Sequence, residues 1–181
     1  MKTLRARAIV CAGAMVALAV PPPAYSETIE NTSAGYRLSV QVEQVDSIHW
    51  EALVALDNSG PVAALTLPLQ WGHGRDPFRI DSADYAGLRT EYFSLKTFRV
   101  DSIKQTVLIG MISDLGGNHP PLEPGEGAIA RLHFTTRRGD GSPLSLDTTF
   151  VPPHNTLQLV TPDVRAIRPR FDKVQAASGP K

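Results

Sequence analysis

Short segments in which apolar and polar residues alternate with a period of two dominate this chain. Residues 36–43 (YRLSVQVE) and 62–71 (VAALTLPLQW) show the pattern most clearly. Successive side chains of a strand point to opposite sides of a sheet, so this alternation is typical of half-buried β-strands. No segment shows a sustained 3.6-residue period with helix caps, and residues 83–89 allow one helical turn at most. The pattern therefore favours an all-β protein.

Further candidate strands have similar lengths and are separated by Gly, Pro, Asn and Asp, which favour turns. They cover residues 50–56, 78–81, 98–102, 105–112, 128–136, 144–147, 157–160 and 164–167. About eight to ten short strands at a spacing of roughly 8–12 residues predict an antiparallel β-sandwich, including jelly-roll-like arrangements. Two such sheets would bury alternate side chains between them.

Two residues of segment 62–71 carry specific predictions. Pro68 has no backbone donor, so its strand is expected to lie at a sheet edge or to carry a bulge there. Trp71 is in phase with the apolar residues of the segment and is predicted to face the core.

The first 26 residues have the layout of a secretory signal peptide. Three basic residues precede the apolar run 8–20, and Ala24-Tyr25-Ser26 then offers small residues before a cleavage site. The run has 13 residues, well short of the roughly 20 that span a bilayer as a helix. We therefore expect cleavage near Ser26 and a secreted, periplasmic or cell-surface protein. Residues 27–172 are expected to form one β-sandwich domain, followed by a disordered tail at 173–181.

The composition of the mature chain excludes several classes of protein. Removing the signal leaves 15 basic and 18 acidic residues, a net charge of −3, which argues against nucleic-acid binding. Cys11, the one cysteine, leaves with the signal, so no disulfide or thiol chemistry is expected. An exported domain without disulfides favours a bacterial source. No later segment is apolar enough to span a membrane.

No catalytic or metal-binding pattern stands out. The histidines are far apart, at His49, His73, His119, His133 and His154. A zinc site usually shows close pairs such as His-x-x-x-His, and the best local pair here is His73 with Asp76. The Arg138-Gly139-Asp140 tripeptide is expected to be part of a turn. The sequence predicts no metal and no cofactor.

Glycoside hydrolysis would need two carboxyl groups across a cleft. Candidates are Asp81, Asp84, Glu91, Asp101, Asp114, Glu123 and Glu126, but the sequence does not place any two of them together. No Gly-x-Ser-x-Gly motif supports a serine hydrolase. The chain is therefore predicted not to be an enzyme, with no catalytic residues.

Aromatic residues offer a candidate binding surface. Tyr85, Tyr92 and Phe93 fall in an irregular region, between about 82 and 96, and are expected to be exposed. Exposed rings could stack on sugars or form a protein contact. Trp50 and Trp71 could serve the same purpose on a sheet, but Trp71 is expected in the core.

Three segments together resemble the cohesin domain, a secreted bacterial β-sandwich that holds dockerin-bearing partners. They are residues 63–71 followed by Asp76-Pro77, residues 80–87 (IDSADYAG), and residues 126–135 (EGAIARLHFT). The resemblance covers roughly residues 36–170 and implies a binding module. Gly72 to Arg75 departs from the family pattern, and no individual contact residue is implied.

These observations lead to one leading hypothesis and two alternatives. The chain is predicted to be an exported, non-catalytic, cohesin-like binding module that attaches to an extracellular protein partner. A carbohydrate-binding module with a polysaccharide ligand is the alternative, and a secreted hydrolase is the second. Coplanar exposed aromatics on one sheet face would favour glycan binding. A flat face with mixed polar and apolar residues would favour protein binding.

Overall fold

A computed structural model describes residues 34–72, 77–136 and 143–174. These residues form strands and turns and contain no α-helix. The strands are β1 (Tyr36–Gln44), β2 (His49–Asn58), β3 (Ala64–Trp71), β4 (Phe78–Asp84), β5 (Leu95–Asp101), β6 (Thr106–Ile112), β7 (Gly125–Thr136), β8 (Leu146–Thr148), β9 (Gln158–Val160), β10 (Ala166–Ile167) and β11 (Arg170–Val174). The all-β prediction is confirmed.

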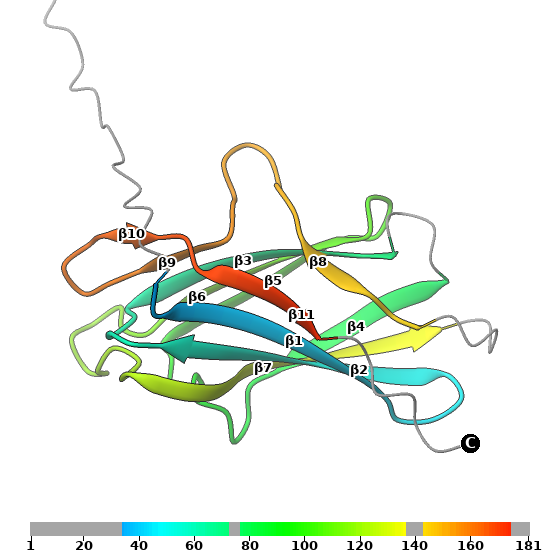
Figure 1. Ribbon diagram of the computed structural model, residues 1–181, viewed down its shortest axis with the longest axis horizontal. Helices are drawn as coiled ribbons and strands as arrows, with labels where there is room; N and C mark the ends of the chain where they lie inside the picture. Colours follow the sequence, from blue (N-terminus) through cyan, green and yellow to red (C-terminus); the bar gives the residue numbers. More distant parts are fainter. Residues whose placement is uncertain (1–33, 73–76, 137–142, 175–181) are drawn as a thin grey trace, which may run out of the picture.

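The strands form two sheets that face each other (Figure 1). Sheet A has the order β10-β9-β3-β6-β5, with β8 paired to the other end of β3, and sheet B has the order β11-β1-β2-β7-β4. All pairs are antiparallel except β1 with β11. The inward side chains of both sheets form one buried cluster. The predicted β-sandwich is therefore confirmed, and a parallel pair is added at one edge.

Trp71 joins the two sheets across this core. It ends β3 and is 1 % exposed, which confirms the prediction that it faces inward. Its ring meets the ring of Phe134 on β7 edge-on, with centroids 5.8 Å apart. Its Nε1 donates a hydrogen bond of 2.9 Å to the carbonyl oxygen of Phe78 on β4. Burying an indole of this size stabilises the fold by about 5 kcal/mol.

Pro68 lies in an interior strand, so the expectation of an edge position is wrong. β3 is paired with β6 on one side and with β8 and β9 on the other. The carbonyl oxygen of Pro68 accepts a hydrogen bond from the backbone N–H of Thr149, on the β8 side. The N and C=O of one residue point to the same neighbour in an antiparallel pair, so the missing donor also faces that side. The neighbouring strand is interrupted there: β8 ends at Thr148 and β9 starts at Gln158.

Strand β11 was not predicted. It pairs in parallel with β1, more than 100 positions away in the sequence, and it continues through Val174. The expected tail boundary at 172 therefore falls inside a strand. Phe171 packs against the core from this position, while charged residues on both sides of it hide the strand pattern.

Several predicted features lie outside the described residues. These are the signal peptide, Cys11, the His73–Asp76 pair, the Arg138–Asp140 turn and residues 175–181.

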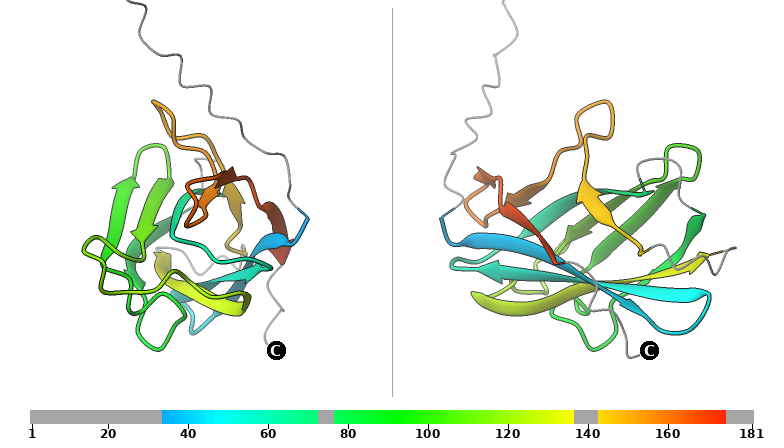
Figure 2. Two further views of the ribbon diagram at one scale, coloured as in Figure 1. Left: turned by 90° about the vertical axis from the view of Figure 1, so that its left-hand side faces the viewer. Right: turned by 45° about the vertical axis from the view of Figure 1, so that its right-hand side comes forward.

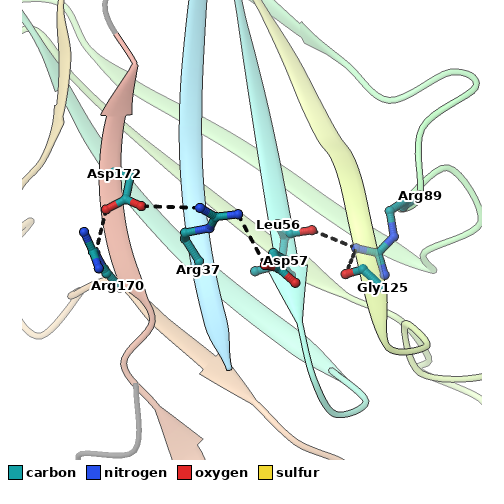
Figure 3. A network of polar contacts seen from close by, with 7 residues as sticks. All are labelled: Arg37, Leu56, Asp57, Arg89, Gly125, Arg170 and Asp172. Carbon is teal, nitrogen blue, oxygen red and sulfur yellow. Dashed lines mark hydrogen bonds and ion pairs between the residues drawn. The ribbon is translucent and has the colours of Figure 1, made fainter. Parts of the chain in front are cut away.

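Arg89 ties the β4–β5 loop to sheet B (Figure 3). Its Nη1 donates hydrogen bonds to the carbonyl oxygens of Leu56 at 2.9 Å and Gly125 at 3.0 Å, and its Nη2 donates to Glu123 at 2.6 Å. Burial lowers the pKa of this guanidinium from its usual range. A Cβ at Gly127 would come within 3.1 Å of Arg89 Cδ. Gly127 also has a φ of +142°, so a side chain at this position would be strained as well as crowded against the arginine.

We expect Arg89→Met to lower the free energy of unfolding by about 2–4 kcal/mol, because three carbonyl oxygens lose a charged donor at once. Arg37→Met is the matched control. Arg37 pairs with Asp57 at 3.4 Å and Asp172 at 4.0 Å, but its side chain is 54 % exposed, so its loss should cost about 0–1 kcal/mol. Urea denaturation followed by circular dichroism measures both. Equal losses in the two variants would contradict this account of Arg89.

Candidate functional site

The outer face of sheet A carries small, hydroxylic and aliphatic side chains. Val107, Ile109 and Met111 on β6 are buried, so they and their register partners on β3 and β5 point toward the core. The residues between them on the three strands point outward and lie opposite one another. We call this surface the sheet-A face. Its members are Ala64, Thr66, Gln70, Leu95, Thr97, Arg99, Asp101, Leu108, Gly110, Ile112, Asp147, Gln158 and Val160. Its charged members lie on outer strands: Arg99 and Asp101 belong to β5, and Asp147 on β8 is ion-paired with Lys173.

The outer face of sheet B is charged, and its charges are paired with one another. Arg131 on β7 lies 3.6 Å from Glu51 on β2 and 3.4 Å from Asp84 on β4. Toward the other edge, the Arg37, Asp57 and Asp172 side chains form the ion pairs drawn in Figure 3. Exposed pairs of this kind stay well solvated and contribute little stability each. Covering them with a partner would cost desolvation free energy.

The contrast between the two faces identifies the candidate site. The centres of protein interfaces are depleted of charged residues, and the sheet-A face meets that condition while the sheet-B face does not. Among the described residues, no aromatic side chain belongs to the sheet-A face. A stacking platform for sugar rings is therefore lacking on it, and its mixture of polar and apolar residues favours a protein contact.

The three aromatic residues predicted as a binding surface lie in the β4–β5 loop in different environments. Phe93 is 3 % exposed and belongs to the core, so its expected exposure is wrong. Its loop turns back at Thr90, whose hydroxyl donates to the Ile129 carbonyl oxygen at 2.5 Å. Tyr92 is 36 % exposed, and its hydroxyl donates to the Pro121 carbonyl oxygen at 3.2 Å.

Tyr85 is half-buried, and its hydroxyl is buried without a hydrogen-bond partner. Burial raises the pKa of this phenol. The ammonium of Lys96 lies 5.7 Å from the centre of the ring, a favourable cation–π distance. Tyr92 is thus the one residue of the predicted trio with a ring substantially open to a partner.

Two of the carboxyl groups considered as catalytic candidates, Asp84 and Asp114, have lowered pKa values. No group of three His, Cys, Asp or Glu side chains within the described part of the chain could hold a metal ion. Backbone N–H groups of Ala86 lower the pKa of Asp84, and those of Gly116 and Asn118 lower the pKa of Asp114. A general acid needs a raised pKa, so neither carboxyl group suits that role.

A hollow of about 310 Å³ lies at the end of the sandwich where β1 begins. Its lining includes Tyr36, Pro61 and Ile167, and its charged residues, Asp163 and Arg165, pair at 2.6 Å. Val164, at the tip of the adjacent β9–β10 hairpin, is 82 % exposed and has a φ of +64°. Such a conformation is strained for a β-branched residue. Thr161, which also lines the hollow, donates a hydrogen bond from its hydroxyl to the Asp163 carboxylate at 2.5 Å.

No helix in the described residues is long and apolar enough to cross a membrane.

Comparison with known proteins gives matches in structure alone. No family model matches the sequence, and no curated protein matches it. Among solved structures, a type I cohesin–dockerin complex, Coh-OlpA-Doc918 of Clostridium thermocellum, gives a TM-score of 0.61 at 10 % identity, over 78 % of this chain and 99 % of the other. The sixth cohesin of scaffoldin B from Acetivibrio cellulolyticus, in complex with a Cel5 dockerin mutant, gives a TM-score of 0.59 at 13 % identity. This match covers 78 % of this chain and 96 % of the other.

A third similar structure is the non-cellulosomal cohesin of the archaeon Archaeoglobus fulgidus. It gives a TM-score of 0.51 at 13 % identity, over 79 % of this chain and 90 % of the other. The protein therefore has a cohesin-like fold, as the sequence resemblance predicted, and nearly the full length of each cohesin is matched.

The turn between β1 and β2 gives a pH-dependent prediction. Hydrogen bonds from His49 Nδ1 and from the backbone N–H groups of Ile48 and His49 lower the pKa of Asp46 from 3.8 to about 2. A depressed pKa means that the ionised carboxylate stabilises the folded state above pH 4, and that this contribution is lost as the pH falls toward 2. The difference in urea midpoint between wild type and Asp46→Ala should therefore be larger at pH 6 than at pH 2.5. A difference in urea midpoint that does not change with pH would contradict this account of Asp46.

Proposed function

We propose that this protein is a non-catalytic binding module that attaches to another protein through the sheet-A face. The observation that carries the proposal is the contrast between the two sheets: sheet A offers a charge-poor face, and sheet B offers a face of solvated ion pairs. Leu108 lies near the middle of the sheet-A face, flanked by Pro68 on β3 and Arg99 on β5. A half-buried leucine at the centre of such a surface is a typical anchor position in an interface.

The solved structures support the class of partner. Two of the cohesins described above were solved as complexes with dockerins, and so was a Coh-OlpC-Doc435 complex with a TM-score of 0.56. We propose a dockerin-like module on a separate polypeptide as the partner. The predicted signal peptide supports an extracellular or cell-surface location, and the lack of disulfides supports a bacterial source. Tyr92, just before β5, and Tyr85 are proposed to extend the contact.

We expect Leu108→Arg to abolish binding of the partner, with a loss of about 100-fold or more, because an unpaired guanidinium would be buried in the interface. Leu53→Arg is the matched control. Leu53 is also a half-buried leucine that points outward from a central strand, but it lies on sheet B between Gln41 and Arg131. Residues 27–181, immobilised, serve as bait for secreted proteins of the producing organism, and bound proteins are identified by mass spectrometry.

A dockerin-like protein captured by wild type and Leu53→Arg, and lost with Leu108→Arg, is the expected result. Equal capture by all three baits would remove the sheet-A face from the proposal. A parallel panel of insoluble polysaccharides tests the alternative: retention there, without any protein captured, would replace the protein-binding function by glycan binding.

A further inference from the structure

The loop between β8 and β9 fills a gap in sheet A. Both short strands pair with β3, β8 near Trp71 and β9 near Ala64, so they are two pieces of one interrupted strand. Residues 149–157 leave the sheet between them, at the place where Pro68 has no N–H to offer. Figure 2 shows this loop (orange) rising from sheet A away from sheet B. We call residues 149–157 the flap.

The flap stands beside the sheet-A face. Pro68 is buried, although the alternation of β3 points it outward between the half-buried Thr66 and Gln70. The N–H of Thr149, the first residue of the flap, donates to the carbonyl oxygen of Pro68 at 3.2 Å, so the flap begins next to this residue of the face. A partner that covered Leu108, the neighbour of Pro68 on β6, would therefore meet the flap at its border.

Backbone hydrogen bonds close the flap into a fixed shape. The N–H of Val151 donates to the carbonyl oxygen of Asn155 at 3.0 Å, and the N–H of Asn155 donates back at 2.9 Å. The Asn155 side-chain amide adds a third hydrogen bond to Val151, at 3.1 Å. Pro152 and Pro153 lie between them and restrict φ further. A loop ordered in this way loses little conformational entropy when a partner binds it.

Phe150 gives the flap an anchor. It is 55 % exposed, among the few large hydrophobic residues that the described chain leaves open to solvent. Residues 149–157 (TFVPPHNTL) contain no Asp, Glu, Lys or Arg, so the flap continues the low charge of the sheet-A face. Phenylalanine is among the aromatic residues that are enriched in protein interfaces relative to the rest of the surface.

We propose that the flap is a second contact element for the protein partner, with Phe150 inserted into an uncharged apolar patch of that partner. This inference rests on the proposed function, since the occupant is the same protein that covers the sheet-A face. The sheet face would supply the broad contact, and the flap would select partners that present an apolar patch at its position.

The test measures the affinity of single variants for the protein that the wild-type bait captures, after that protein has been produced and purified. Phe150→Ala is expected to weaken binding about 30-fold or more, and Phe150→Leu to restore most of it. Val45→Ala is the control, because Val45 is also exposed, at 58 %, but belongs to the β1–β2 turn of sheet B. Its affinity should stay within about twofold of wild type. Thermal unfolding of every variant verifies that the fold is intact.

The outcomes separate this inference from the proposed function. If Phe150→Ala binds within about twofold of wild type while Leu108→Arg does not bind, the flap is no contact element and the sheet-A face stands. A Phe150→Ala loss matched by an equal loss in Val45→Ala would also overturn the role of the flap. If the wild-type bait captures no protein at all, both proposals fall together.

Discussion

The indole of Trp71 is the contact on which the arrangement of the two sheets depends. It belongs to sheet A, yet its ring packs on Phe134 and its N–H is satisfied by Phe78, both of sheet B. A buried indole N–H without an acceptor would be costly, so the hydrogen bond fixes the position of β4 relative to β3. With the sheets held in this relation, one side of each is committed to the core. The two remaining sides are then free to acquire different surfaces.

Those surfaces divide the molecule by charge. Sheet B satisfies its arginines and carboxylates within its own face, and it can remain in water at little cost. Few charged side chains point outward from sheet A, and Leu108, Ile112 and Val160 are half-exposed on it instead. The asymmetry is a property of neighbouring strands rather than of any one strand. It therefore arises only when β3, β6 and β5, which are separated by loops and turns in the sequence, lie side by side (Figures 1 and 2).

The sequence predicted which segments form strands better than it predicted which strands lie beside one another. Period-two alternation in the clearest segments, together with turn residues between the others, located the strands from β1 to β10. It missed β11, where only Phe171 of a charged segment reaches the core. Pro68 was expected at an edge, since a missing donor is most easily tolerated there. The fold instead placed the missing donor opposite an interruption in the adjoining strand, which a single sequence does not reveal.

The candidate site was harder to predict for the same reason. Phe93 looked exposed because its segment is irregular, but the turn at Thr90 directs it into the core. Phe150 carried a usable signal: an aromatic residue followed by Val151 and two prolines in an uncharged run between two short strands. The pairing of strands that creates the sheet-A face depends on contacts between distant residues, and no local pattern records it.

The interruption opposite Pro68 also affects which changes of sequence the fold can tolerate during evolution. Elsewhere in the two sheets, an insertion within a strand would shift the register and turn core side chains outward. Between β8 and β9 the ladder with β3 is already broken, so the connecting segment can lengthen, shorten or exchange residues while both pieces keep their pairing. Loop closure adds little cost as such a segment grows. At this break, changes in sequence can accumulate with little effect on stability, directly beside the surface that is free to meet other molecules.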